Sequence, residues 1–507
     1  LLTWGNVPGT ITAVSTGDTK FGEVVARDAS LAVTGGSILD YGVDGLNVDT
    51  LAVSSAGTVS LGGRIGALGT VTANGDTAFR SSSNLAFTDT VNIGTGRLML
   101  TSTGAISQTG GAITAGAIDV SAATGIDLGR SNNIVTITGL STTNGDISFR
   151  NWASIALPGI SAPGTVTLVS ESGSVTQNIG TTLRANRLNA SAATFIDLTN
   201  ANLLASLGTL DAGTTIGVTN HGSFSLTGDI AATSVTLRST FGAISQTGGV
   251  ISASDLTATA QNGLNFGGAN NVSALHGLST TFGDIAFRNQ GDIVVSDVSA
   301  LTGAVTLTSD SGSIAQNAST AISAERLNAS AATGITLDQD NRFVRTGTLS
   351  NSGTGGIRVK TTGNLDLAGT VTATGQAVRF DVGGALTQSV ALGAYSNLTI
   401  NAGTGLYLDQ ANNFGATLFS LSTGSGDITV RNVGNLTVPA LSTAGGTIRL
   451  ISDTGTIGQT GILTANTLIA TARRSIDLSR NNVVTNLGGL SNESGDIRFR
   501  DVDGFNI

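Results

Sequence analysis

A short pattern that recurs at regular intervals constrains the fold of this chain more than any other feature. It reads GDISFRN at Gly145–Asn151, GDIAFRN at Gly283–Asn289, GDITVRN at Gly426–Asn432 and GDIRFRD at Gly495–Asp501. A second pattern, Gly-x-aliphatic-x-Gln, ends at glutamines spaced 69 to 72 residues apart: Gln108, Gln177, Gln246, Gln316, Gln388 and Gln459. Such a constant period indicates a repeat architecture, in which each pattern is a building unit.

Alternation within the patterns predicts β-strands. In GDISFRN, Ile147 and Phe149 alternate with polar residues, which is the period of a strand that buries one face. No 3.6-residue apolar stripe with helix caps accompanies these strands. The first inward residue of each pattern gives an aliphatic ladder: Ile106, Ile126, Ile147, Val175, Ile196, Ile216, Ile244, Leu264, Ile285, Ile314, Ile335, Ile357, Leu386, Leu406, Ile428, Ile457, Ile476 and Ile497. It extends upstream through Ile38 and Val59 and breaks at Thr77.

Short strands without room for crossover helices predict an all-β fold, a right-handed parallel β-helix or β-solenoid. We expect one continuous solenoid over residues 1–507, with three coils in each repeat of about 70 residues and roughly 22 coils in all. The expected repeats are 1–35 (partial), 36–103, 104–172, 173–241, 242–311, 312–383, 384–454 and 455–507 (partial).

Composition excludes several classes of function. The net charge is −9 and the pI is near 4.7, so the chain lacks the basic stripe that a nucleic acid or an anionic membrane requires. The absence of cysteine from the sequence removes disulfides, thiolate metal sites and thiol catalysis. No apolar run of about 18 residues spans a bilayer, so we expect no membrane insertion.

Two amide series interrupt the apolar pattern. The six glutamines lie two residues after a ladder residue, where parity places them inward. A column of amides could bind a ligand, but we favour a structural role in which each glutamine satisfies backbone groups at a bend. A second series is expected to occupy the next corner, because asparagine bonds local backbone: Asn133, Asn202, Asn271, Asn341, Asn413 and Asn482.

Charged residues also recur within the repeat. Four outward aspartates each precede an outward arginine: Asp146 and Arg150, Asp284 and Arg288, Asp427 and Arg431, and Asp496 and Arg500. Such pairs resemble the equipment of a lyase or hydrolase, yet identical copies in successive repeats favour a solvated charged face.

The remaining candidates for a chemical site are few. His221 and His276 lie at unrelated repeat positions without metal-ligand spacing, and Trp4 and Trp152 are too few for a sugar-binding platform. We therefore predict no catalytic, cofactor-binding or metal-binding residue, and no enzyme. The alternative is a polysaccharide-degrading enzyme, for which the irregular stretch Asp338–Arg345 is the place to look.

The repeats GAISQTGG, SAATGIDL, NNV and LSTTxGDIxFRN resemble the shaft of filamentous haemagglutinin-like exoproteins of bacterial two-partner secretion. The resemblance implies a long right-handed β-helix that is secreted through an outer-membrane transporter partner to the surface or surroundings of a Gram-negative bacterium. Such exoproteins act in attachment, biofilm formation or toxin delivery. The secretion domain of that family and its Asn-Pro-rich signature are missing from this sequence, and both ends are abrupt, so we expect a segment of a longer array.

These observations predict a structural or adhesive extracellular shaft that acts in attachment or in a biofilm matrix. Its expected partners are the transporter, implied by the resemblance, and a host or cell-surface glycan or receptor. End-to-end or lateral self-association into a matrix fibre is an alternative, because open β-edges recruit other edges.

Overall fold

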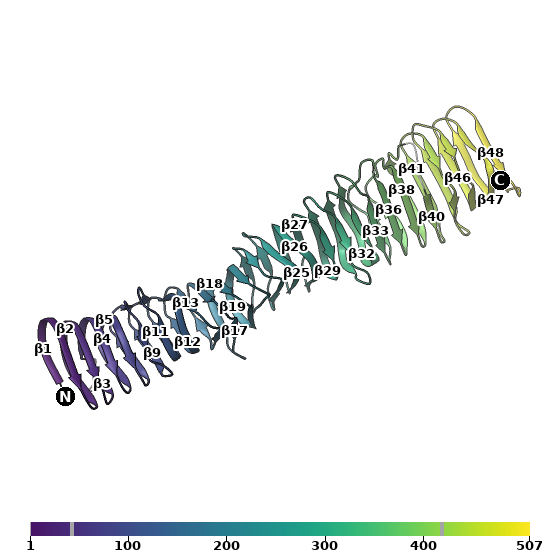
Figure 1. Ribbon diagram of the computed structural model, residues 1–507. Coiled ribbons are helices and arrows are strands. Elements are labelled where there is room, and N and C mark those ends of the chain that lie inside the picture. Colours follow the sequence, from purple (N-terminus) through teal and green to yellow (C-terminus); the bar gives the residue numbers. More distant parts are fainter. Residues whose placement is uncertain (1, 41–44, 416–419) are drawn as a thin grey trace. The chain divides into compact units, whose positions relative to one another are not determined.

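The computed structural model describes residues 2–40, 45–415 and 420–507, which form β-strands and no helix (Figure 1). The chain divides into two units, Leu1–Ala253 (unit 1) and Ser254–Ile507 (unit 2). Together the units contain about 24 turns of parallel stacked strands, close to the expected 22. The prediction of a parallel β-solenoid is therefore confirmed for the fold class. The expectation that residues 1–507 form one continuous solenoid stays a prediction.

Long and short strands follow one another along unit 1. Its strands are β1 (Leu2–Ser15), β2 (Thr19–Val33), β3 (Ile38–Asp40), β4 (Leu46–Ser55), β5 (Val59–Ala73), β6 (Thr77–Ser81), β7 (Leu85–Phe87), β8 (Val91–Asn92), β9 (Arg97–Ser102), β10 (Ile106–Gln108), β11 (Ile113–Ala122), β12 (Ile126–Thr142), β13 (Ile147–Asn151), β14 (Ile155–Leu157), β15 (Ile160–Ser161), β16 (Thr165–Ser170), β17 (Val175–Gln177), β18 (Leu183–Ala192), β19 (Phe195–Ala212), β20 (Thr215–Asn220), β21 (Phe224–Leu226), β22 (Ile230–Ala231), β23 (Ser234–Ser239) and β24 (Ile244–Gln246).

Strand β25 (Ile251–Ala260) includes the boundary between the units in sequence. The strands of unit 2 are then β26 (Leu264–Thr280), β27 (Ile285–Asn289), β28 (Ile293–Val295), β29 (Val298–Ser309), β30 (Ile314–Gln316), β31 (Ile322–Ala331), β32 (Ile335–Asn351), β33 (Ile357–Thr361), β34 (Leu365–Leu367), β35 (Val371–Thr372), β36 (Ala377–Val382), β37 (Ala385–Gln388), β38 (Asn397–Ala402), β39 (Gly405–Asn412), β40 (Ser420–Thr423), β41 (Ile428–Asn432), β42 (Leu436–Val438), β43 (Leu441–Ser442), β44 (Thr447–Ser452), β45 (Ile457–Gln459), β46 (Leu463–Ala472), β47 (Ile476–Asn492) and β48 (Ile497–Asp501).

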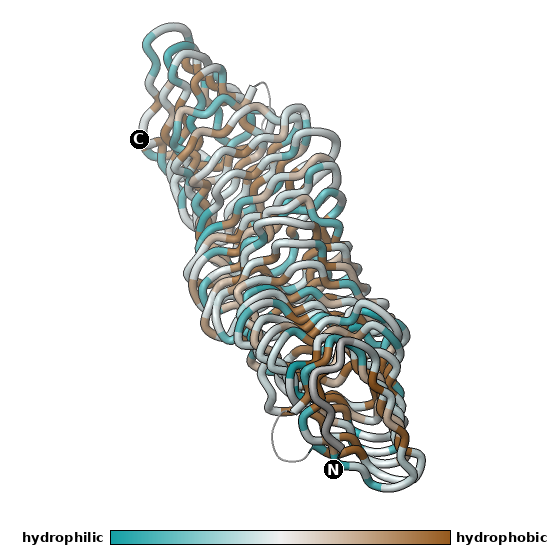
Figure 2. The backbone as a smooth tube through the Cα atoms, turned by 90° about the vertical axis from the view of Figure 1, so that its left-hand side faces the viewer, coloured by the Kyte–Doolittle hydropathy of each residue, from teal (hydrophilic) through white to brown (hydrophobic). Residues whose placement is uncertain are grey.

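The aliphatic ladder forms the core of both units. Its members from Ile106 to Ile476 are at most 2% exposed, as are Ile38 and Val59 upstream. Thr77, where the ladder was expected to break, is also fully buried, and its hydroxyl donates to the carbonyl of Gly75 at 3.2 Å. Ile497 in the last strand is 42% exposed. In Figure 2, hydrophobic stretches (brown) accordingly recur in coil after coil.

Strand register shows how the sequence repeat maps onto the coils. One column of unit 1 passes through paired residues on eight successive coils: Ile106, Ile126, Ile147, Val166, Leu188, Leu207, Leu226 and Gln246. Gln246 thus lies seven coils after Ile106 in this column. Gln246 is also the equivalent of Gln108 two repeats later, so two repeats span seven coils. Val175, the equivalent of Ile106 one repeat later, instead pairs with Ile155 and Ile196 in a different column.

A repeat of about 70 residues therefore spans about three and a half coils, and the expectation of three coils per repeat is wrong. Neighbouring repeats place the same pattern in two different columns, and the true structural period is two repeats. The sequence carries this longer period. GAISQTGG occurs identically at Gly104–Gly111 and Gly242–Gly249, and RLNASAAT occurs identically at Arg187–Thr194 and Arg326–Thr333.

Candidate functional site

The glutamines at the corners bond to asparagines of the next coil. Gln108 Nε2 donates to Asn132 Oδ1 at 2.8 Å and to the carbonyl of Gly111 at 3.0 Å. The same amide pairing recurs at 2.8–2.9 Å between Gln177 and Asn202, Gln316 and Asn341, Gln388 and Asn412, and Gln459 and Asn482. The structural role predicted for the glutamines is thus confirmed at these corners, with the asparagine of the next coil as an additional partner.

Each of these asparagines links three coils. Asn132 Oδ1 accepts from the backbone N–H of Ile113 at 2.8 Å on the preceding coil. Its Nδ2 donates to the carbonyl of Leu128 at 3.2 Å on its own coil and to that of Arg150 at 3.1 Å on the next coil. Buried backbone groups at the corner are satisfied in this way, which supports a structural role for these amides.

Three of the six asparagines predicted for this corner are wrong by one residue. Asn133, Asn271 and Asn413 are exposed, whereas Asn132, Asn270 and Asn412 are buried. Strand parity could have identified the buried members. In every repeat the buried asparagine follows the inward apolar residue by four positions, as Asn132 follows Leu128, and therefore faces inward as well.

The aspartate and the arginine of the GDI pattern form hydrogen bonds with different residues. Asp284 Oδ1 accepts from the backbone N–H of Ala304 at 2.8 Å on the next coil. Arg288 Nε donates to Asp310 Oδ1 at 2.9 Å, also one coil on, and this carboxylate raises the pKa of Arg288. Asp146 and Asp427 bond Thr165 and Thr447, and Arg150 and Arg431 bond Glu171 and Asp453, in the same way. At these three copies the expected outward charges bond between coils.

The two histidines have different partners. His221 stacks on Phe241 with 4.8 Å between ring centroids, and His276 Nε2 lies 2.9 Å from Asp255 Oδ1. Within the described residues no group of three or more His, Asp or Glu side chains could hold a metal ion.

The irregular stretch Asp338–Arg345 lies on β32. Lys360 Nζ lies 2.8 Å from Asp340 Oδ1, and this hydrogen bond and the charge of Lys360 lower the pKa of Asp340. Asp338 accepts from Gln339 Nε2 at 2.9 Å. Both carboxylates are thus engaged by side chains on the outer face of the coil.

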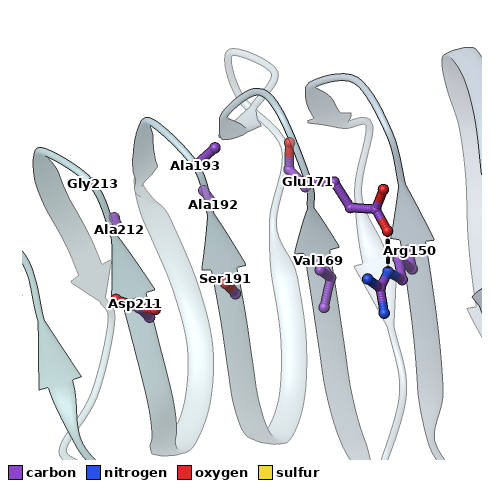
Figure 3. A pocket seen from close by; sticks show the side chains of 10 residues that line it. Arg150, Val169, Glu171, Ser191, Ala192, Ala193, Asp211, Ala212 and Gly213 are labelled. Atoms are coloured by element: carbon purple, nitrogen blue, oxygen red, sulfur yellow. Dashed lines mark hydrogen bonds and ion pairs between the residues drawn. The ribbon is translucent and has the colours of Figure 1, made fainter. Parts of the chain in front are cut away.

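A groove of about 580 Å³ runs across consecutive coils of unit 1 (Figure 3). Its outward column consists of Arg150, Val169, Ser191 and Asp211, which are register partners on β13, β16, β18 and β19. The groove is open because Ala192, Ala193, Ala212 and Gly213 line one side of it.

Glu171 binds Arg150, the only arginine among the residues that line this groove. Arg150 Nε donates to Glu171 Oε1, and Ser131 Oγ donates to Glu171 Oε2 at 2.8 Å. The hydrogen bond from Ser131, followed by that from Arg150, lowers the pKa of Glu171 below its ordinary 4.5. Asp211 faces Ser191, so the groove presents a carboxylate and no unpaired cation.

Comparisons with known proteins identify repeats of the same period. Residues 82–141, 282–350 and 354–420 match a family described as repeats of unknown function (DUF5649). The matched segments end 33, 34 and 32 residues after Gln108, Gln316 and Gln388, so they share one phase of the repeat. No curated protein and no solved structure matches the chain. Among the described residues, no helix is long and apolar enough to cross a membrane.

Proposed function

We propose that this chain is a structural shaft, a spacer that holds another part of a larger protein at a distance. One observation carries the proposal: the polar residues that recur in every repeat bond from coil to coil. Asn341, for example, accepts from the backbone of Ile322 and donates to the carbonyl of Lys360. A repeated binding or catalytic site would instead leave such groups available for a ligand.

Small-angle X-ray scattering of the purified chain tests this role. If the two units continue as one solenoid, about 24 coils at roughly 4.8 Å each give a particle about 115 Å long. A maximum dimension well below that value, or two lobes that move independently, would contradict a rigid spacer.

We further propose that the shaft acts outside the cell, on the surface of a Gram-negative bacterium, in attachment or in a biofilm matrix. The resemblance to filamentous haemagglutinin-like repeats supports this location, and so does the absence of cysteine from a chain that would cross the outer membrane unfolded through a transporter partner. Antibody labelling of intact cells tests it. Signal that is lost on mild protease treatment is expected; signal that requires cell lysis would refute a surface location.

The shaft is proposed to have no enzymatic activity. Incubation with pectin, alginate or hyaluronan should give no cleavage products. Cleavage that is abolished by Asp338→Ala or Asp340→Ala would establish the alternative, a polysaccharide-degrading enzyme. Analytical ultracentrifugation tests the other alternative, since a self-assembling matrix fibre would sediment as long oligomers.

A further inference from the structure

A second groove lies on the outer face of unit 2 and has a volume of about 320 Å³. Four consecutive coils contribute its outward residues: Thr336 on β32, Arg358 on β33, Arg379 on β36 and Thr399 on β38, each the register partner of the next. Gly356, Ala377 and Asn397 line the groove beside them. The volume lies at the lower end of the roughly 300–1,000 Å³ of small-ligand pockets.

The two arginines of this groove differ in their partners. Arg379 binds Asp381 through two hydrogen bonds, at 2.6 and 3.0 Å. Burial raises the pKa of Asp381, but the hydrogen bonds from Arg379 and Asn401 and the charge of Arg379 outweigh it and hold that pKa below 3.8. Arg358 is exposed, and its side chain has no hydrogen bond or ion pair among the residues that the structure describes.

Two neighbouring carboxylates are neutralised by other cations, and a third, Asp338, accepts from Gln339 Nε2. Asp340 pairs with Lys360 at 2.8 Å, and Asp381 is held by Arg379. Arg358 is thus the register partner of another arginine, on a neighbouring strand about 4.8 Å away, and has no ion pair of its own among the described residues. The charge of Arg379 is neutralised by Asp381 whereas that of Arg358 is not, so a bound anion would pair with Arg358.

The pair Arg358 and Arg379 also departs from the repeat. The corresponding register partners are Ser148 and Thr167, Gly217 and Thr236, Ala286 and Thr306, and Thr429 and Arg449. Single arginines occur at these positions, Arg449 at that of Arg379 and Arg498 at that of Arg358, but these register pairs contain no second pair of arginines. Two adjacent arginines therefore are not required to build a coil. A local departure from a consistent pattern is where a functional site is expected.

We propose that this groove binds carboxylate groups of an acidic polysaccharide, with Arg358 as the principal ligand-binding residue. A guanidinium binds a carboxylate through two parallel hydrogen bonds, and Arg358 has this fork free. Thr399 Oγ1 donates to Asn397 Oδ1 at 3.2 Å, which leaves the hydroxyl oxygen as an acceptor and the amide N–H groups of Asn397 as donors for sugar hydroxyls, beside the hydroxyl of Thr336. The proposal adds a ligand to the shaft and does not depend on the location of the shaft.

The chemistry of the lining favours a sugar over an acidic peptide. The apolar residues Ile357 and Val378 are fully buried, so the groove offers no pocket for an apolar side chain. A peptide could not add as a strand either, because β33 and β36 are already paired on both sides.

Isothermal titration calorimetry of the full chain with galacturonate oligomers tests the proposal. Binding is expected for the wild type, weaker at higher salt, and Arg358→Ala should lower the affinity at least about tenfold. Arg358→Lys should recover part of it, because lysine keeps the charge without the fork. Arg449→Ala is the matched control, an exposed outward arginine of unit 2 outside the groove, and should bind as the wild type does.

Three further ligands separate the outcomes. Neutral dextran oligomers should not bind, and free galacturonate should bind more weakly than the oligomers. Equal binding of galacturonate oligomers by the wild type and Arg358→Ala would overturn the proposal, as would their failure to bind at all. Tighter binding of oligo-glutamate than of galacturonate oligomers would also overturn it, since the partner would then be an acidic peptide. Melting curves confirm that each variant is folded.

Discussion

The groove of unit 1 and the groove of unit 2 are built alike but use their arginines differently. Both cross consecutive parallel coils and are lined by outward residues in register. In unit 1, Arg150 belongs to the repeated pattern and is bound by Glu171 one coil on. In unit 2, Arg358 occupies the pattern position of Ser148, which is Arg498 in the last copy, and it is unpaired among the described residues. The arginine at the position of Arg150 thus bonds the next coil, whereas Arg358 has no such partner.

The largest effect is expected in the shared scaffold behind the grooves. Asn132→Ala removes the acceptor of the Ile113 N–H and the donor to the carbonyls of Leu128 and Arg150, all at a buried corner next to the unit 1 groove. We expect a loss of roughly 2–4 kcal/mol in local stability, because unsatisfied buried groups cost about 1–3 kcal/mol each. Hydrogen exchange of β11–β13 measures it, since a solenoid can open locally.

Asn133→Ala is the matched control for this change. Asn133 is the exposed neighbour, and its replacement should leave exchange in β11–β13 as in the wild type. Equal protection from exchange in the two variants would mean that the corner amides do not hold the coils together. The polar residues that recur in the repeat would then not differ from Arg358 in having a structural role.

The next prediction tests whether Arg379 contributes to binding in the groove of unit 2. Asp381→Ala removes the carboxylate that neutralises Arg379, so the groove gains one unit of positive charge. Galacturonate oligomers should then bind about threefold to tenfold more tightly, with a steeper dependence on salt. Unchanged or weaker affinity in calorimetry would show that Arg379 does not take part in recognition.

Much of the fold could be predicted from the sequence because parity and period are local signals. The inward residues of GDISFRN, Ile147 and Phe149, follow from alternation alone, and both are buried. The number of coils per repeat could not be obtained in this way. It depends on which residue lies above which, and this register sets Ile147 against Val166 and not against Val175, the next residue of the expected ladder.

The candidate site was less predictable than the fold. The stretch Asp338–Arg345 differs from the repeat in sequence, and Lys360 and Arg358 lie on β33, the next coil from it. Arg358 and Arg379 themselves are 21 residues apart, so sequence distance alone does not show that they are neighbours. Comparison of each outward residue with its counterpart one coil on would have revealed the unpaired guanidinium.

A smaller effect is expected on the melting temperature, where the arginine variants of the two grooves should differ. Arg150→Ala should lower the melting temperature slightly, because Glu171 loses a partner. Arg358→Ala should leave it unchanged or raise it slightly, because a like-charge neighbour of Arg379 is removed. Differential scanning calorimetry of both variants under identical conditions measures the two changes in melting temperature. Equal decreases in melting temperature would show that Arg358 stabilises the coil, which would argue against a guanidinium that is free to bind a ligand.

The smallest effect is a pH dependence confined to the groove of unit 1. The pKa of Glu171 lies below 4.5 in the folded chain, owing to the hydrogen bonds from Ser131 and Arg150. Its contribution to stability is therefore fully present above pH 4.5 and is lost as the pH falls through the lower, folded value.

Trp152 provides a local probe of this titration. It is 58% exposed, and its carbonyl accepts from the N–H of Ser172, the neighbour of Glu171. In a Trp4→Phe background, which leaves Trp152 as the single tryptophan, its emission should change with a midpoint below pH 4.5. The same transition in a Glu171→Gln variant would mean that another carboxylate is responsible. Its disappearance there would assign the titration to the pair of Arg150 and Glu171, a pairing that Arg358 lacks.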